Sequence, residues 1–358
     1  MTPLIRAIID TSALRQNLET LRRKAPGSRI MAVVKANAYG HGLIPTVLAL
    51  PQADAFAVAR LEEGIALREA GVNQSIVLLE GIFAAEQLTE AARQRFEIVV
   101  HDPSQVALLE RYTGEHGFIV WLKIDTGMNR LGFRTEEFPK ILERIRALRR
   151  PAAEVRLMTH LARADERDCP MTTQQLERFR AITQKLSLIT SIGNSAGLLG
   201  WQGACGEWVR PGLALYGIAP FAGESSDALG LIPVMTLASS VIAVRRVPRG
   251  ESVGYGGAWT APNDARIAIV AGGYGDGLLR SLPTGTPVLV NGRRAPLVGR
   301  VAMDMIAVDV SQQPEVEVGT RCVLWGRGLE VAEVAGHAGT VAYELLCGVR
   351  QRVPRELI

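Results

Sequence analysis

The 358-residue chain has only four cysteines, at 169, 205, 322 and 347, and no CxxC pair. These spacings fit neither a zinc site nor a disulfide framework, so we expect reduced thiols and no bound metal. No apolar run reaches the roughly 18 residues that a transmembrane helix needs, and the N-terminus lacks the apolar segment of a signal peptide. These absences argue against a membrane protein and lead us to expect a cytoplasmic one.

The charges show no concentration of one sign. The net charge is +4 and the isoelectric point is near 9.0, but the lysines and arginines are scattered along the chain, so we expect no nucleic-acid partner. A hydrophobic content of 47% and a charged content of 21% are typical of a globular protein. The length suggests about two domains, one of which has room for an α/β barrel of roughly 250 residues.

Apolar, β-branched segments alternate with amphipathic ones through residues 1–228. The segments 61–71 and 172–186 carry apolar residues at helical spacing. Such alternation predicts a parallel sheet, and eight strands in about 200 residues favour a (β/α)8 barrel, with a doubly wound sheet as the alternative. The predicted strands are residues 30–34, 55–59, 76–79, 97–100, 118–124, 155–159, 188–192 and 212–217.

The sequence changes character near residue 229, where glycine, proline and short strand-like segments become frequent. This texture predicts a mainly β domain over 229–358, of sandwich or barrel type, with short helices near 330–339 and 343–349. A strand at 4–10 precedes the barrel and is a candidate to pack with the second domain. Residues 11 and 12, a threonine and a serine, are expected to cap the following helix.

The segment AVVKANAYGHG, residues 32–42, places Lys35 where an apolar strand stops. Lysine is almost never fully buried unless it is paired, and catalytic groups of a barrel lie at the C-terminal ends of its strands. Barrel phosphate sites commonly use the loops after strands 7 and 8, where Ser195 and the backbone near Gly212 and Leu213 are expected. A lysine beside a phosphate site suggests pyridoxal 5′-phosphate bound as a Schiff base. Other polar residues expected at this end of the barrel are Lys123, Arg130, His160, Asn194 and Arg210, each of which is alone also compatible with an ordinary paired or solvated charge.

The segment 32–42 resembles the cofactor-lysine motif of the alanine racemases, which are fold-type III pyridoxal-phosphate enzymes. The resemblance continues in family order along nearly the whole chain. The further matching segments are KIDTGMNRLGF, LMTHLARADE, GNSAG, WVRPGLALYG, VGYGGAW, GYGDG, GRVAMDMIAVDV and GTVAYELLC. The resemblance implies an isomerase that interconverts L-alanine and D-alanine with pyridoxal 5′-phosphate, working as a homodimer with shared active sites.

The resemblance also implies a role for each matching residue. Lys35 carries the cofactor and is one catalytic base, and Tyr255 of the partner subunit is the other. Arg210 faces the pyridine nitrogen, and His160 joins Arg210 and Tyr255 in a hydrogen-bonded network. The remaining implied contacts are Tyr39, Ser195, Gly212, Leu213 and Tyr343 with the phosphate, Asn194 with the cofactor, Arg130 and the backbone N–H of Met303 with the substrate carboxylate, and Tyr274 and Tyr343 at the entrance.

Three positions need a separate remark. Lys123 matches a lysine that is carbamylated in much of the family, and the alternative is an unmodified lysine paired with Asp125. Ser191 stands where some members have a histidine near the cofactor. Gly275 replaces the alanine of the family's GYADG, a change that we expect to loosen a turn at the entrance.

Two bases on opposite faces of Cα invert it directly, which is the reason for pairing Lys35 with Tyr255. Arginine cannot accept the pyridine proton, so Arg210 disfavours side reactions such as transamination. It also argues against a decarboxylase of similar architecture, since those enzymes place an acidic residue there. A non-enzymatic cofactor carrier would not need the second domain. Two questions stay open: racemisation of serine beside alanine, and whether D-alanine serves as a peptidoglycan precursor or L-alanine is supplied for alanine catabolism.

Overall fold

The first sheet closes into a parallel barrel. The computed structural model describes residues 4–148 and 152–358. The strand order is β5-β4-β3-β2-β10-β9-β8-β6, and β5 also pairs with β6, so the first and last strands meet. The short β7 (Phe133–Arg134) adds to the outer side of β6. The barrel strands are β2 (Arg29–Val33), β3 (Ala55–Val58), β4 (Ser75–Leu78), β5 (Glu97–Val100), β6 (Ile119–Asp125), β8 (Glu154–Met158), β9 (Thr190–Ser191) and β10 (Trp208–Val209).

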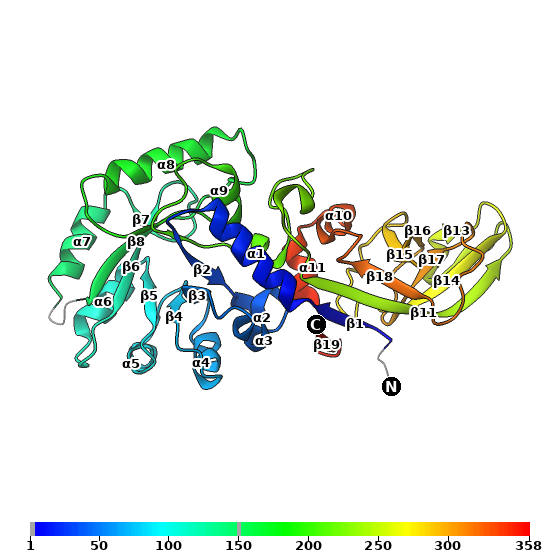
Figure 1. The fold of residues 1–358 in the computed structure, drawn as a ribbon, viewed down its shortest axis with the longest axis horizontal. Helices are drawn as coiled ribbons and strands as arrows, with labels where there is room; N and C mark the ends of the chain where they lie inside the picture. The colour runs from blue at the N-terminus through cyan, green and yellow to red at the C-terminus, as the bar shows by residue number, and fades with distance from the viewer. Residues whose placement is uncertain (1–3, 149–151) are drawn as a thin grey trace.

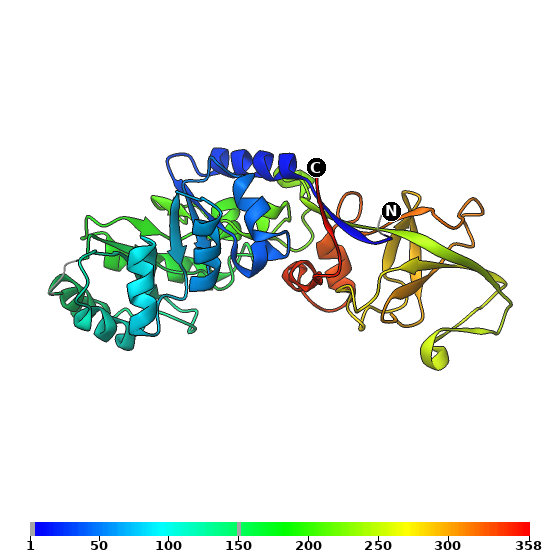
Figure 2. The same ribbon diagram turned by 90° about the horizontal axis from the view of Figure 1, so that it is seen from below.

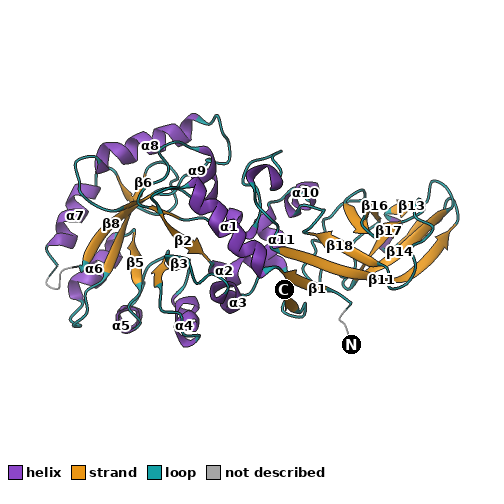
Figure 3. Ribbon diagram, in the orientation of Figure 1, coloured by secondary structure: helices purple, strands orange, loops and turns teal. Residues whose placement is uncertain are grey.

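Helices follow most of the strands and surround the barrel (Figure 3). Continuous apolar strands covered by helices are expected of a parallel sheet, and β3 and β5 are buried at every position. The helices are α1 (Thr11–Lys24), α2 (Lys35–Tyr39), α3 (Leu43–Leu48), α4 (Leu61–Glu69), α5 (Ala85–Arg93), α6 (Pro103–Arg111), α7 (Phe138–Arg146), α8 (Pro170–Thr183) and α9 (Ser195–Gly200), with 3₁₀ turns η1 (Leu213–Tyr216) and η2 (Asp227–Leu229).

The predicted eighth strand at 212–217 is wrong. The strand is the shorter β10, and residues 213–216 form the 3₁₀ turn η1. Pro211 has no N–H to donate to a ladder, and a short buried apolar run looks the same in a strand and in a helical turn. As a consequence Arg210 directly follows its strand instead of preceding it, as a residue of the catalytic face should.

The predicted cap of the first helix is also wrong. Asp10 is the N-cap of α1, and its carboxylate accepts hydrogen bonds of 2.9 Å from the backbone N–H groups of Ser12 and Ala13. Residues 11 and 12 lie inside the helix. An ionised carboxylate is a stronger acceptor for these N–H groups than a hydroxyl, which decides between neighbouring candidates.

A second sheet, mainly antiparallel, follows the barrel (Figure 1). Its order is β14-β17-β16-β15-β18-β11, and the long β11 also pairs with β14, which closes six strands into a ring. Its elements are β11 (Met235–Val247), β14 (Ala265–Ala271), β15 (Pro287–Val290), β16 (Arg293–Val298), β17 (Met305–Asp309), β18 (Arg321–Trp325), the small pair β12 (Ser252–Val253) and β13 (Trp259–Thr260), the 3₁₀ turn η3 (Tyr255–Gly257), α10 (Val331–His337) and α11 (Ala342–Gly348).

The two ends of the described chain meet beside this second sheet. The early strand β1 (Arg6–Ile9) runs antiparallel to β11 and parallel to β19 (Arg355–Leu357). Both segments lie at the junction between the barrel and the second sheet (Figure 2). The barrel is therefore entered from a strand that belongs to the other sheet.

Membrane-spanning helices and metal-binding clusters are absent from residues 4–148 and 152–358. No helix there combines the length and apolarity required to cross a membrane. No group of histidine, cysteine, aspartate or glutamate side chains there has a metal-binding arrangement.

Candidate active site

A cavity of about 470 Å³ lies at the C-terminal ends of the barrel strands. Lys35 reaches it from just after β2, Lys123 from the end of β6, and Arg210 from just after β10. The barrel thus gathers side chains that are far apart in the sequence. The residues predicted from the sequence that line this cavity are Lys35, Tyr39, Lys123, Arg130, His160, Asn194, Ser195, Arg210, Gly212, Leu213 and Tyr343.

Three residues predicted for the same site lie elsewhere. Tyr255, Tyr274 and Met303 belong to the second sheet and its loops and do not line the cavity. Tyr255 and Met303 are exposed, by 71% and 53% of their surface. Within one chain, the residues predicted for the site therefore divide into a cavity group and an exposed group.

Lys35 begins a turn of unusual backbone conformation. The four residues after it, Ala36–Tyr39, all have φ between 51° and 55°, in the left-handed region. Each such non-glycine residue costs about 1–2 kcal/mol, so the turn needs outside support. Glu63 gives part of it, because its carboxylate accepts a 2.7 Å hydrogen bond from the backbone N–H of Ala36. Glu63 carries no signal in the sequence that would have assigned it to the site.

The cavity is strongly cationic. Burial, followed by the charges of Arg210, Arg130 and Lys35, lowers the pKa of Lys123 to about 8. Burial and the same surrounding cations also hold the pKa of His160 well below its usual range, so this imidazole is neutral. Such a cavity favours a ligand with negative groups.

Arg210 is buried among neutral partners. Its guanidinium donates to the Ser191 hydroxyl and the Thr159 carbonyl, each at 2.6 Å, and lies 3.5 Å from Nδ1 of His160. Burial lowers its pKa to about 10, so the group stays charged at neutral pH. Ser191, which stands where some family members have a histidine near the cofactor, is here a buried acceptor for Arg210.

Hydroxyl groups also line the cavity. The Ser195 oxygen accepts 3.1 Å hydrogen bonds from the backbone N–H groups of Gly212 and Ala214, which leaves its own proton free to donate. A Cβ atom at Gly212 would come within 2.4 Å of the Tyr39 hydroxyl oxygen, so a larger residue there would displace this hydroxyl. The hydroxyls of Ser195, Tyr39 and Tyr343 together are the donor set that suits a phosphate.

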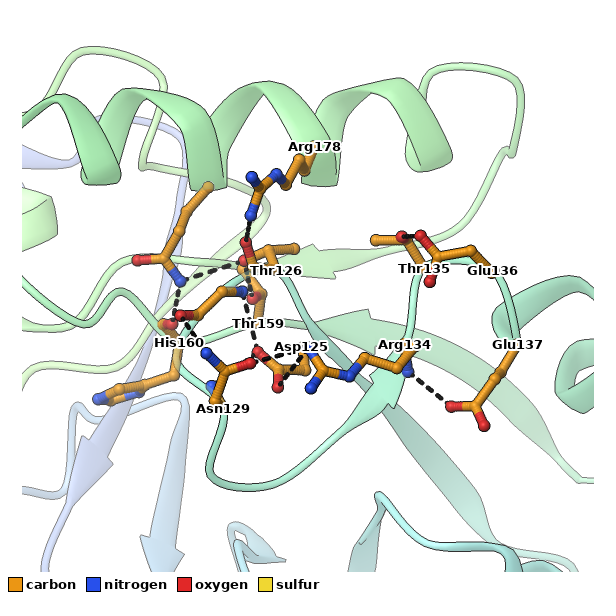
Figure 4. Close-up of polar contacts among 12 residues, drawn as sticks. Asp125, Thr126, Asn129, Arg134, Thr135, Glu136, Glu137, Thr159, His160 and Arg178 are labelled. Carbon is orange, nitrogen blue, oxygen red and sulfur yellow. Dashed lines mark hydrogen bonds and ion pairs between the residues drawn. The ribbon is translucent and has the colours of Figure 1, made fainter.

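Arg130 lies in the loop between β6 and β7, and side chains hold this loop in place (Figure 4). The Asp125 carboxylate accepts a 3.1 Å hydrogen bond from the backbone of Asn129, and the Asn129 side chain accepts one of 2.7 Å from Arg134. Arg178 of α8 donates to a carbonyl of the same loop. Asp125 thus has its carboxylate occupied by its own loop, and no hydrogen bond to Lys123 is seen in the described part of the chain.

The turn that carries Tyr274 is well supported despite its glycine. The backbone N–H of Gly275 donates to the Met303 carbonyl at 2.8 Å. The buried Asp276 carboxylate binds Arg352 through two hydrogen bonds of 2.7 and 3.0 Å. The first contact ties the turn of Tyr274 to the segment around Met303, and the second ties it to Arg352.

Family models match both parts of the chain. The model for the N-terminal domain of alanine racemase matches residues 9–220, and the model for the C-terminal domain of alanine racemase matches residues 234–357. The alanine racemase of Shewanella baltica is 48% identical over 353 residues, which are 99% of each chain. That of Aliivibrio salmonicida is 45% identical over 352 residues, 98% of each.

Solved structures agree with these matches. The biosynthetic alanine racemase of Pseudomonas aeruginosa is 45% identical and has a TM-score of 0.97, with 100% of each chain covered. The alanine racemase of Acinetobacter baumannii is 40% identical with a TM-score of 0.94 over the same full coverage. The likeness extends over the barrel, the second sheet and the junction between them.

Proposed function

The chain belongs to the alanine racemase family and is an isomerase that interconverts L- and D-alanine, and from that premise we propose how its residues carry out the reaction. The family depends on pyridoxal phosphate, and we propose that this chain holds the cofactor in the barrel cavity. The observation that carries the proposal is the lining of that cavity, which combines the cationic Lys35 and Arg210 with the hydroxyls of Ser195, Tyr39 and Tyr343.

The residues present fit this cofactor. The hydroxyls of Ser195, Tyr39 and Tyr343 would hold its phosphate beside Gly212, where a larger residue would collide with Tyr39. Lys35 is the lysine for the covalent attachment. When bound, pyridoxal phosphate withdraws electrons from Cα of an attached amino acid and so makes its proton removable.

Lys35 and Tyr255 of the partner subunit serve the two faces of Cα. For either direction, one group removes the proton on its face and the other donates a proton on the opposite face. After one turnover the group that removed a proton is protonated and the group that donated one is deprotonated. Proton exchange with solvent then returns both groups to their starting states. Arg130 and the backbone N–H of Met303 of the partner subunit hold the substrate carboxylate, which fixes Cα between the two bases.

Arg210 selects the reaction. It is a donor without acceptor capacity, and its neighbours Ser191 and Thr159 are neutral. Arg210 would face the pyridine nitrogen of a bound cofactor and would offer it no carboxylate to keep it protonated. The cofactor would then withdraw electrons only moderately, which would suit removal of a proton and disfavour decarboxylation or transamination.

We also propose that Lys123 is carbamylated, that the protein is a cytoplasmic homodimer, and that the division into a barrel domain and a base-supplying domain lies near residue 228. The free amine of Lys123 is surrounded by cations that disfavour its charge. A carbamate in its place is an anion that attracts Arg130.

The exposure of Tyr255 and Met303 supports the proposed dimer, in which these residues would complete the cavity of the partner subunit.

The assignment of Tyr255 can be tested in deuterium oxide. Wild type should wash deuterium into both alanine isomers and invert both. Tyr255→Phe should exchange the proton of one isomer only, through Lys35, and should lose inversion by a factor on the order of 10³. Chiral chromatography with mass detection measures both. Tyr112→Phe, a phenol packed against Phe118, is the matched control and should behave as wild type.

Two outcomes would contradict the proposal. Unchanged exchange of both isomers in Tyr255→Phe would remove Tyr255 as a base. Borohydride reduction of the wild-type enzyme should attach the cofactor permanently to Lys35, and a mass tag on another lysine would remove Lys35.

A further inference from the structure

His41 is completely buried two residues after Tyr39, and the mechanism above does not use it. Its Nδ1 lies 2.9 Å from the Ala38 carbonyl oxygen and 3.0 Å from the Tyr39 carbonyl oxygen. Carbonyl oxygens only accept, so Nδ1 must carry the proton. Burial lowers the pKa of His41 to about 4, and Nε2 is buried without a partner in the described residues. The ring is therefore a neutral donor of a fixed tautomer.

The two carbonyls that His41 binds belong to the left-handed turn after Lys35. Ala38 and Tyr39 have φ of 54° and 51°, a conformation that costs free energy at each residue. A donor that bridges both carbonyls opposes relaxation of the turn. Glu63 holds the start of the turn through Ala36, and His41 holds its end.

A row of aromatic rings connects His41 with the cavity. The His41 ring stacks on Tyr216 with 4.4 Å between centroids, and Tyr216 lies 4.8 Å from Tyr39. Tyr39 lies 5.6 Å from Tyr343, and both line the cavity. The Tyr216 hydroxyl donates to the carbonyl of Val33 in β2, which anchors the row to the barrel.

We propose that His41 is a positioning residue for the cofactor phosphate, because its Nδ1–H fixes the turn that aims the Tyr39 hydroxyl beside Gly212. This inference rests on the proposed function, since it assumes that Tyr39 binds the phosphate. It predicts that His41 affects recognition of the phosphate group and leaves recognition of the pyridoxal ring unchanged.

The test compares two ligands on the full-length chain freed of cofactor with hydroxylamine. Pyridoxal 5′-phosphate and pyridoxal, which lacks the phosphate, are titrated against protein fluorescence. His41→Phe keeps a stacked ring but loses the donor. It should weaken pyridoxal 5′-phosphate about tenfold, the equivalent of one hydrogen bond, and change pyridoxal less than about twofold. His41→Asn, whose amide N–H takes the place of Nδ1–H, should restore most of the phosphate preference.

Two controls separate positioning from general support of the fold. His101 is also buried and binds the Glu80 carbonyl through its other nitrogen, away from the turn, and His101→Phe should leave the ratio of the two affinities unchanged. In a double-mutant cycle, His41→Phe should add little to the loss caused by Tyr39→Phe, because both remove the same contact.

Several outcomes would overturn the inference. Equal weakening of both ligands in His41→Phe would make His41 a structural residue only, and no weakening would make it dispensable. The wild-type protein gives an independent answer if the variant does not fold: nitrogen-15 NMR of histidine must show a neutral ring protonated at Nδ1, and a proton on Nε2 would refute the geometry. If wild type itself fails to bind pyridoxal 5′-phosphate at Lys35, the proposed function fails, whatever His41 does.

Discussion

Among single residues, Lys123 has the most unusual environment. Three cations, Arg210, Arg130 and Lys35, add to its burial and lower its pKa to about 8. At pH 7 about a tenth of its amine is then neutral, compared with well under a thousandth for an ordinary lysine. A neutral amine attacks carbon dioxide, which forms an N–C bond and releases one proton.

Carbamylation of Lys123 should therefore depend on pH. Below pH 8 the amine is mainly protonated and cannot react, so with fixed total bicarbonate the labelled fraction should grow as pH rises and level off above about 8. Carbon-13 NMR with labelled bicarbonate measures it. Lys123→Arg should abolish the signal and Lys185→Arg should not. Absence of a signal from wild type at pH 9 would leave the unmodified lysine as the answer.

The places of Lys35 and His160 could be predicted from the sequence, because each follows a barrel strand whose end the apolar pattern marks. The place of Arg210 could not, because the eighth strand was predicted after it and lies before it. The supporting contacts of Glu63 and Ser191 could not be predicted, because they depend on the register between elements. The left-handed turn Ala36–Tyr39 could not be predicted either, because none of its residues is a glycine, the residue that usually adopts this conformation.

Among the secondary-structure elements, the barrel strands β5 and β8 are joined by a buried charge pair. Arg156 of β8 binds the Glu97 carboxylate of β5 at 3.1 Å, and the same carboxylate accepts a 2.7 Å hydrogen bond from the Trp121 indole. The Arg156 guanidinium also stacks over the rings of Trp121 and Trp208. Trp121 lies two residues before Lys123 on the same face of β6, so this cluster lies deeper in the barrel than the cavity.

Loss of the Glu97 charge should reduce stability without affecting the reaction. Glu97→Gln leaves a buried guanidinium without its buried partner and should lower the free energy of unfolding by about 3 kcal/mol. Glu154 is the other ion-pair partner of Arg156, and its side chain is 35% exposed. Glu154→Gln should therefore lower the free energy of unfolding by less than about 1 kcal/mol. Urea unfolding measures both, and KM for alanine should stay unchanged. Similar losses in the two variants would show that burial of Glu97 is not what matters.

Most elements of the barrel could be predicted because their local patterns are unambiguous. Strands such as β3 and β5 begin at the predicted residues 55 and 97, since both are short apolar runs that alternate with helical segments. The exception at 212–217 shows the limit of such patterns. There the 3₁₀ turn is stabilised by Ser195, a partner outside the local sequence.

For the whole molecule, the separation of Tyr255 from Lys35 is the decisive feature. If the proposed dimer shares its sites, two inactive variants should rescue each other. Mixing Lys35→Ala with Tyr255→Phe after dissociation makes about half of the dimers mixed, and one site in each mixed dimer combines two intact residues. Activity should recover to about a quarter of wild type.

The alternative arrangement gives a different result in this experiment. If each site took both residues from its own chain, every site would carry one lesion and mixing would recover nothing. No recovery, with subunit exchange verified by mass, would therefore refute the shared site and leave the chemistry of the two bases untouched.

The pairing of β1 with β19 has a consequence for the synthesis of the protein. Thr11 and Ile358 are joined by hydrogen bonds although they are 347 positions apart in the sequence. At roughly 5–20 residues per second, the first strand leaves the ribosome tens of seconds before its parallel neighbour exists. The barrel strands are synthesised much earlier than β19. One edge of the first strand therefore stays exposed to wrong partners until β19 has been synthesised, and the rate of translation sets how long.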